Sequence, residues 1–284
     1  PLIVDDIRGG SYKFLVHTGV MRQLVTPVGV GEKGDYYVES FWDPTGMTAT
    51  HLHEGVDFTA RQSYINATRG FGSIEWGTYT YITDNVKEDG RESVVDEHSR
   101  AHGITHAKYL EKNLLANFAN FTGGALLATA PTAGSNGLTL GKIAAGKTLL
   151  QGGEKDVGDS IYHVTHPYCW TYFVQNMTNN ANYGVRGDMG NSVQEKYWLA
   201  TLLGDVSVFY SNYFSRVGTS AGTTARMTTG MFTKSVIGLY MPRDYRLEDQ
   251  RFITERSTKL VSTMRYGSAC RIPAFGIKLT TLAA

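Results

Sequence analysis

A chain of 284 residues with 42% hydrophobic residues is long enough to bury one large core or two smaller ones. The formal net charge of +1 excludes the strongly basic surface of a dedicated DNA or RNA reader, although it allows loose contact with nucleic acid. Two distant cysteines make no disulfide framework, so we expect synthesis in a reducing compartment. No apolar run reaches the roughly 18 residues of a membrane span, and residues 1–10 lack the order of a signal peptide.

The first third of the chain predicts an arm followed by a long hairpin. Residues 1–34 show no sustained period and are expected to be extended, with short structured pieces at most. Residues 35–42 and 60–68 are rich in aromatic and β-branched side chains and enclose the turn-rich stretch 43–57. With charges along its length, such a hairpin has little apolar surface to bury in its own domain, and an isolated hairpin is marginally stable. We therefore predict that it lies on another subunit.

The next segment predicts a strand that leads into one long helix. Residues 73–86 alternate with the period of a strand. From about residue 91 to 121 the period becomes helical, and the helix is about 30 residues or roughly 45 Å long. Gly103 lies inside it at a cost of about 1 kcal/mol relative to Ala, and marks either a bend or a close packing contact. The apolar stripe of this helix comprises Ile104, Ala107, Leu110, Leu114, Leu115, Phe118 and Phe121.

The second half of the chain mixes helices and strands without an internal repeat, which we interpret as an α+β fold. Glycine- and asparagine-rich stretches at 178–191 and 217–225 predict surface loops. The expected elements are a loop at 122–137, helices at 139–151, 166–177 and 193–204, strands at 161–164 and 206–214, and a closing strand at 251–270 followed by the segment 271–279.

Residues 141–148, GKIAAGKT, match the phosphate-binding pattern G-x-x-x-x-G-K-[ST] without a break. That motif needs a buried strand ending at its first glycine, but ten residues separate the nearest apolar run from Gly141. Thr139 is a suitable N-cap, and the apolar residues that follow share one helical face. We therefore expect a helix here and no nucleotide site.

Two groups of histidines could carry chemistry. His98, His102 and His106 recur at one-turn spacing, which can chelate zinc. They lie away from the apolar stripe, so we expect a solvated row that a neighbouring subunit could use for a pH-sensitive contact. His163 and His166 flank Cys169 in the manner of a nucleophile–base pair, but the aromatic surroundings of Cys169 favour a small buried residue. We expect no catalytic residue, metal site or cofactor.

The order of these elements resembles the major capsid proteins of tailed bacteriophages, which have the Hong Kong 97 fold. Residues 49–58 are similar to the Ala…Glu-Gly segment of that family's extended loop, and residues 79–86 to the strand entering its spine helix. Residues 161–173 are similar to the strand, His-Pro and helix of the axial domain, and residues 251–279 to the closing strand of the peripheral domain. The resemblance covers nearly the whole chain.

The resemblance implies a division into an N-terminal arm at 1–34, an extended loop (E-loop) at 35–72, a peripheral domain with the spine helix at 73–121 and 246–284, and an axial domain at 122–245. It also implies a non-enzymatic protein that self-assembles, as hexamers and pentamers, into an icosahedral shell around double-stranded DNA. The implied location is the virion, after assembly in the host cytoplasm and without a membrane. Portal and scaffolding proteins are implied partners, with decoration proteins as a further candidate.

The tip of the hairpin carries the predicted intersubunit contacts. An exposed tip lacks the dry cavity that metal or acid–base chemistry needs, so contact with a partner is favoured. Some family members covalently link a Lys of the loop to an Asn of a neighbour, but here no Lys occurs between Lys33 and Lys87 and no Asn after Asn212. We therefore expect no such cross-links. The predicted contact residues are His51, His53, Glu54, Asp57 and Arg61.

Two alternatives stay open. An encapsulin-type nanocompartment would use the same fold without phage DNA. A nucleotide-hydrolysing enzyme would rest on residues 141–148 alone.

Overall fold

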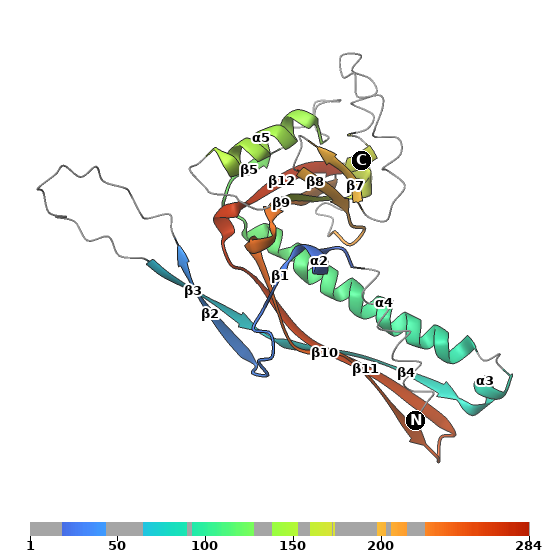
Figure 1. The fold of residues 1–284 in the computed structure, drawn as a ribbon. Helices are drawn as coiled ribbons and strands as arrows, with labels where there is room; N and C mark the ends of the chain where they lie inside the picture. Colours follow the sequence, from blue (N-terminus) through green and yellow to red (C-terminus); the bar gives the residue numbers. More distant parts are fainter. Residues whose placement is uncertain are drawn as a thin grey trace, which may run out of the picture.

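The computed structural model describes residues 19–43, 65–89, 93–127, 138–152, 160–171, 173, 198–202, 206–214 and 225–283. Within these ranges, helices pack against a four-stranded and a six-stranded sheet, while a separate two-stranded hairpin projects from the body (Figure 1). The α+β architecture expected from the sequence is confirmed.

The four-stranded sheet has the order β1 (Thr26–Val28), β10 (Ile237–Phe252), β11 (Ser257–Cys270) and β4 (Ile74–Thr83). The strands β10 and β11 form an antiparallel hairpin, and the chain reverses in the turn 253–256. The predicted single strand over 251–270 is therefore wrong at its beginning. The alternation of side chains continues on both sides of the turn, so periodicity alone does not reveal the reversal.

The long helix α4 (Ser93–Ala116) follows the short helix α3 (Asp84–Asp89) and continues into a 3-10 turn, Asn117–Asn120. It lies along the four-stranded sheet and runs through Gly103 without interruption (Figure 1). The predicted long helix is thus confirmed, and all of its apolar stripe except Ile104 is buried. Burying a large aliphatic or aromatic side chain contributes about 1.5–3 kcal/mol, so this stripe holds the helix on the sheets.

The six-stranded sheet has the order β5, β12, β9, β6, β8 and β7. Its strands are β5 (Ala125–Leu127), β12 (Gly276–Ala283), β9 (Ala225–Thr233), β6 (Ile161–Thr165), β8 (Val206–Tyr210) and β7 (Trp198–Leu202). The helix α5 (Leu140–Gln151) packs its buried Ile143 and Leu150 into the core of this sheet. The helix can approach β9 closely at Gly146, because a Cβ at that position would lie only 3.1 Å from the sulfur of Met231.

The helix predicted over 193–204 is wrong for its described part. Residues 198–202 form the edge strand β7, which pairs antiparallel with β8. A short apolar run fits either a helix or a strand, and pairing with a neighbouring strand decides the outcome here. The helix predicted over 166–177 is confirmed at residues 167–171 and 173, with Pro167 in its first turn.

The predicted domain limits do not follow the sheet limits. The strand β10 crosses residue 245 without a break, and β12 pairs within the six-stranded sheet although it lies in the predicted segment 246–284. Segments from both ends of the sequence therefore contribute to both sheets. The division into arm, loop, peripheral and axial domains stays a prediction.

Residues 19–43 contribute a short helix, a strand and the first half of the projecting hairpin. The helix α2 (Met21–Leu24) lies against α4, and β1 adds a parallel strand to β10. These short pieces agree with the expectation for the end of the N-terminal arm. The hairpin consists of β2 (Tyr36–Asp43) and β3 (Ile65–Gly72), and its second strand ends later than the predicted residue 68, while the predicted start at residue 60 lies outside the described residues.

Candidate functional site

The projecting hairpin is held to the body by its first cross-strand pairs, which we call the hairpin root: residues 35–39 and 69–73. Tyr37 pairs with Phe71 in the hairpin register, and both side chains face the body. The Tyr37 ring stacks on Tyr240 of β10 with 5.4 Å between centroids, while Phe71 is only 1% exposed. The Tyr240 hydroxyl donates a 2.8 Å hydrogen bond to the carbonyl of Gly34. The expectation that the hairpin buries little apolar surface in its own subunit is therefore wrong for the root.

Glycines allow this close packing. A Cβ at Gly238 of β10 would lie 2.7 Å from the ring of Phe71, so the aromatic side chain occupies the space that any larger residue needs. Gly29, just before the hairpin, has a φ of +59°, and a Cβ there would lie 2.9 Å from the Tyr240 ring. At the root, aromatic rings therefore pack directly against the backbone of these glycines.

Arg271, which follows β11, marks the outer limit of the root. Its guanidinium donates to both carboxylate oxygens of Glu39 at 2.6 and 2.7 Å, and each side chain is 18% exposed. Arg69 lies directly opposite Glu39 in the hairpin, and its Nε donates to the Arg271 carbonyl at 3.3 Å. Bidentate, partly buried pairs of this kind fix direction as well as distance. Beyond them, Ser40 and Thr68 are exposed.

The side of the root that faces away from the body is apolar and open. Tyr36 is 64% exposed and Val38 is 52% exposed. The Tyr36 hydroxyl end lies over Gly70, where even a Cβ would clash with it. An exposed apolar face on a rigidly held projection is typical of a surface that another molecule covers.

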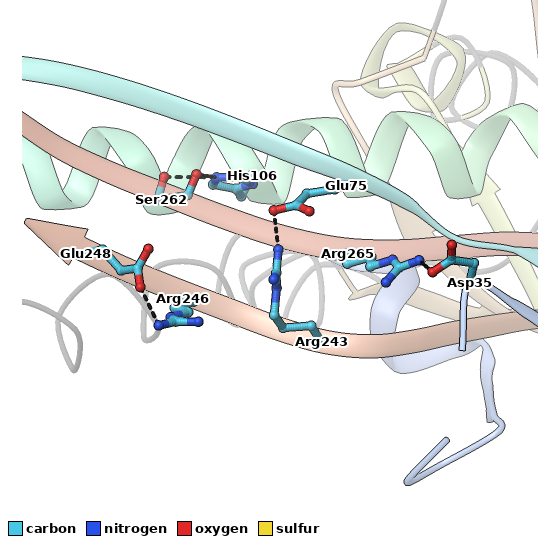
Figure 2. Close-up of polar contacts among 8 residues, drawn as sticks. All are labelled: Asp35, Glu75, His106, Arg243, Arg246, Glu248, Ser262 and Arg265. Atoms are coloured by element: carbon cyan, nitrogen blue, oxygen red, sulfur yellow. Dashed lines mark hydrogen bonds and ion pairs between the residues drawn. The ribbon is translucent and has the colours of Figure 1, made fainter. Parts of the chain in front are cut away.

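The four-stranded sheet also presents an open face, opposite α4. Figure 2 shows Arg243 paired with Glu75, Arg265 with Asp35, and Arg246 with Glu248. The pair of Arg265 and Asp35 joins this face to the first residue of the root. At least one partner in each pair is more than one-third exposed, so each contributes at most about 1 kcal/mol to stability.

Exposed aromatic residues extend this open face along β4. Tyr79 is 60% exposed and Tyr81 is 48% exposed, and their rings meet edge to face. The ammonium of Lys259 on β11 lies 4.6 Å from the centre of the Tyr79 ring. This cation–π contact adds a second kind of attractive interaction to the ion pairs on the open face.

The opposite face of the sheet contradicts the predicted solvated histidine row. His102 and His106 are 2% and 3% exposed, because they point from α4 into the sheet. Both contact the hydroxyl of Ser262 on β11, at 2.7 Å from His102 Nδ1 and 2.9 Å from His106 Nε2 (Figure 2 shows the His106 contact). His102 Nε2 lies 3.0 Å from the hydroxyl of Thr80. His98, the third histidine of the row, is more exposed than these two and is half-buried.

Burial keeps these imidazoles neutral. Burial and, to a smaller extent, the neighbouring His106 and His98 together lower the pKa of His102 to about 4. Burial also lowers the pKa of His106, partly offset by its contact with the Ser262 carbonyl. Since that carbonyl only accepts, His106 Nε2 carries a proton, and Ser262 can donate in turn to His102 Nδ1. His102 and His106 therefore belong to a neutral hydrogen-bond chain between helix and sheet.

The other sequence candidates fall into structural roles. Residues 141–148 lie inside α5, where the Thr139 hydroxyl accepts from the amide of Lys142 and the Thr148 hydroxyl donates to Ala144. A helix interior has no free amides with which to cradle phosphate, so the predicted helix is confirmed and the motif is coincidental. Cys169 is fully buried against Met227, as expected for a small apolar residue.

The described ranges contain no group of three His, Cys, Asp or Glu side chains that could hold a metal ion. None of their helices combines the length and apolar character that crossing a membrane requires.

The predicted tip contacts lie outside the described residues. These residues are His51, His53, Glu54, Asp57 and Arg61. Sequence reasoning also missed the root, where Glu39 and Arg271 are 232 positions apart. No local pattern signals such a pair, and only the paired strands bring its members together.

No family model and no curated protein sequence matches this chain. Several solved structures, by contrast, match it. The capsid of the cyanophage P-SCSP1u is 17% identical with a TM-score of 0.69, covering 92% of this chain and 87% of that one. The mature capsid of bacteriophage PhiM1 is 12% identical with a TM-score of 0.64, covering 92% and 86%. The head of Helicobacter pylori bacteriophage KHP40 is 10% identical with a TM-score of 0.65, covering 90% and 87%. The chain therefore has the α+β fold of phage capsid proteins, as the resemblance implied.

Proposed function

We propose that this chain is the major capsid protein of a tailed bacteriophage and assembles into the icosahedral head shell around double-stranded DNA. The observation that carries the proposal is the hairpin: its root is fixed on one side by Tyr240 and Arg271, while its other side is apolar and open. A projection that is held rigidly and left uncovered is suited to reach another copy of the chain. The likeness to phage capsids over nine-tenths of the chain supports the same function.

In the proposed shell, the hairpin of one subunit lies on its neighbour within hexamers and pentamers, and the tip residues 51–61 contribute contacts. Residues 1–34, 35–72, 73–121 with 246–284, and 122–245 act as arm, loop, peripheral and axial domains. The net charge of +1 suits a wall that encloses DNA without gripping it. Portal, scaffolding and decoration proteins are the proposed further partners, in a virion assembled in the host cytoplasm.

The proposal assigns no catalysis to the chain. The phosphate-binding match lies within a helix, and His102 and His106 are engaged between helix and sheet. The compared structures are phage capsids and heads, which favours a phage head over a nanocompartment. The absence of covalent cross-links stays a prediction, and a denaturing gel of mature shells should show monomers.

Negative-stain electron microscopy of the purified chain tests the proposal. The wild-type chain should form closed shells, while a variant with residues 44–64 replaced by a short turn should give a folded subunit and no shells. Circular dichroism and size-exclusion chromatography establish that the variant is folded. Lys147→Ala serves as the control and should assemble normally. Loss of a measurable ATPase activity in this variant would instead support the nucleotide-hydrolysing alternative.

Shells from the shortened variant would contradict the assigned role of the hairpin, and a wild-type chain that never assembles would contradict the function itself. Particles from infected cells separate the two shell hypotheses, because DNA-filled heads with a portal vertex exclude a nanocompartment.

A further inference from the structure

One acidic side chain is buried where the N-terminal segment meets the long helix. Glu111 of α4 is 1% exposed and lies beside Met21 and Leu24 of α2. Its Oε2 accepts a 3.0 Å hydrogen bond from the Met21 amide. A Cβ at Gly19 would lie 3.4 Å from the same oxygen, so the chain passes directly over the carboxyl group.

No cation compensates this carboxyl group among the described residues. The groups that face it are the amides of Val20 and Met21 from α2 and the hydroxyl of Ser211 after β8. The nearest basic side chain of α2, Arg22, pairs instead with Asp244 of β10 at 3.1 Å. Burial raises the pKa of Glu111, the three facing groups offset part of this rise, and the resulting pKa is about 7. A charged Glu111 is therefore costly as long as α2 covers it.

We propose that Glu111 is a proton-dependent latch that holds residues 19–28 against the long helix. When the carboxyl group is neutral, α2 covers it without an electrostatic cost. When it loses its proton, the charge favours release of α2 into solvent. The helix α2 leads directly into β1, and Val28 of β1 packs with Phe71 and Tyr240. Release of α2 therefore also weakens the packing of the hairpin root. The latch goes beyond the proposed function, since it operates within a single subunit.

The direction of the pH dependence follows from the two pKa values. Complete exposure of Glu111 on release of α2 would return its pKa to the ordinary 4.5, whereas the covered carboxyl group titrates at about 7. Docking of α2 is therefore strongest below pH 4.5, weakens as the pH rises to 7, and is constant above it. The full change in the docking equilibrium is up to about 300-fold, and between pH 5.5 and 8 it is about 25-fold.

Hydrogen–deuterium exchange of the full-length chain at pH 5.5 and 8 tests the latch. Protection factors remove the intrinsic pH dependence of exchange, so a change reports the structure alone. The wild-type peptide covering residues 20–25 should lose about 25-fold in protection at pH 8. A reference peptide in β11 should not change. His102 and His163, with pKa values of about 4, do not titrate in this window.

Two variants make the assignment specific. Glu111→Gln keeps the shape and stays neutral, so the peptide 20–25 should be protected equally at both pH values. Glu97→Gln, at an exposed position of the same helix, should keep the wild-type response. Equal wild-type protection at both pH values, or an unchanged response in Glu111→Gln, would overturn the proposal. If Glu111→Gln does not fold, the wild-type comparison still decides. The outcome is independent of whether shells form.

Discussion

The two faces of the four-stranded sheet carry polar side chains in opposite physical states. On the face covered by α4, Ser262 joins two buried, neutral imidazoles. On the open face, three residues along the same strand, Arg265 pairs with a carboxylate that is 86% exposed. The alternation of β11 places these groups on opposite sides (Figure 2). The covered face therefore determines the stability of the subunit, while the charges of the open face are available for contacts with other molecules.

Replacing Ser262 with Val should have the largest effect on stability. His102 Nδ1 would lose its partner, His106 Nε2 would keep only the 3.3 Å contact with the backbone carbonyl, and a buried group left unsatisfied costs about 1–3 kcal/mol. We expect the free energy of unfolding in urea to fall by about 3 kcal/mol. Thr263→Val, one residue along on the open face, should change it by less than about 0.5 kcal/mol. Equal losses in the two variants would remove the distinction between the faces.

The hairpin root allows the same comparison between two arginines. Arg271→Ala would leave Glu39 partly buried without its bidentate partner and should cost about 2 kcal/mol. Arg265→Ala removes a partner of the exposed Asp35 and should cost less than about 0.5 kcal/mol. Urea unfolding measures both values, and hydrogen exchange at residues 36–39 should rise only in Arg271→Ala. A larger loss in Arg265→Ala would show that the root is anchored at its base instead.

The pH dependence of unfolding should reveal the buried histidines. The pKa of His102 is depressed by the fold, so stability that is present above pH 6.5 is lost as the pH falls toward 4. The raised pKa of Glu111 acts oppositely, since stability increases as the pH falls from 7 to 4.5. The lowered pKa values of His106 and His163 act in the same direction as that of His102, so the wild-type stability should still fall as the pH drops from 6.5 to 4.5. His102→Asn should be stabilised relative to wild type as the pH falls, and parallel profiles would contradict the assignment.

The smallest effect is expected on the open face itself. Glu75→Gln removes the charge that faces Arg243, in a pair with exposures of 53% and 38%. Unfolding free energy should change by less than about 0.5 kcal/mol, as measured in urea at low salt. A loss comparable to that of Ser262→Val would mean that the open face also stabilises the subunit.

Sequence patterns predicted the elements whose signals are local. The apolar stripe of α4, the alternation of β4 and the N-cap Thr139 of α5 each depend on neighbours within a few residues. The edge strand β7 was missed because its short apolar run is ambiguous until β8 pairs with it. The histidine row was misplaced because a helix wedged against a sheet buries a wider arc than its apolar stripe.

The hairpin illustrates the same limit within the candidate site. Its two strands were predicted from composition, but its attachment through Tyr240 and Arg271 depends on residues about 200 positions away. The difference between a hairpin that is free throughout and one that is anchored at its root can be seen only in three dimensions.

The central claim is that the hairpin is fixed within one subunit by the inner side of its root, while a neighbour covers the outer side of the root and the tip. A cryo-electron microscopy reconstruction of the assembled particles tests this most directly. We predict a closed shell in which Tyr36, Val38 and the tip residues lie against another copy, while Glu39 and Arg271 stay paired within the subunit. A hairpin that folds back on its own subunit, with its outer face uncovered by any neighbour, would contradict the account.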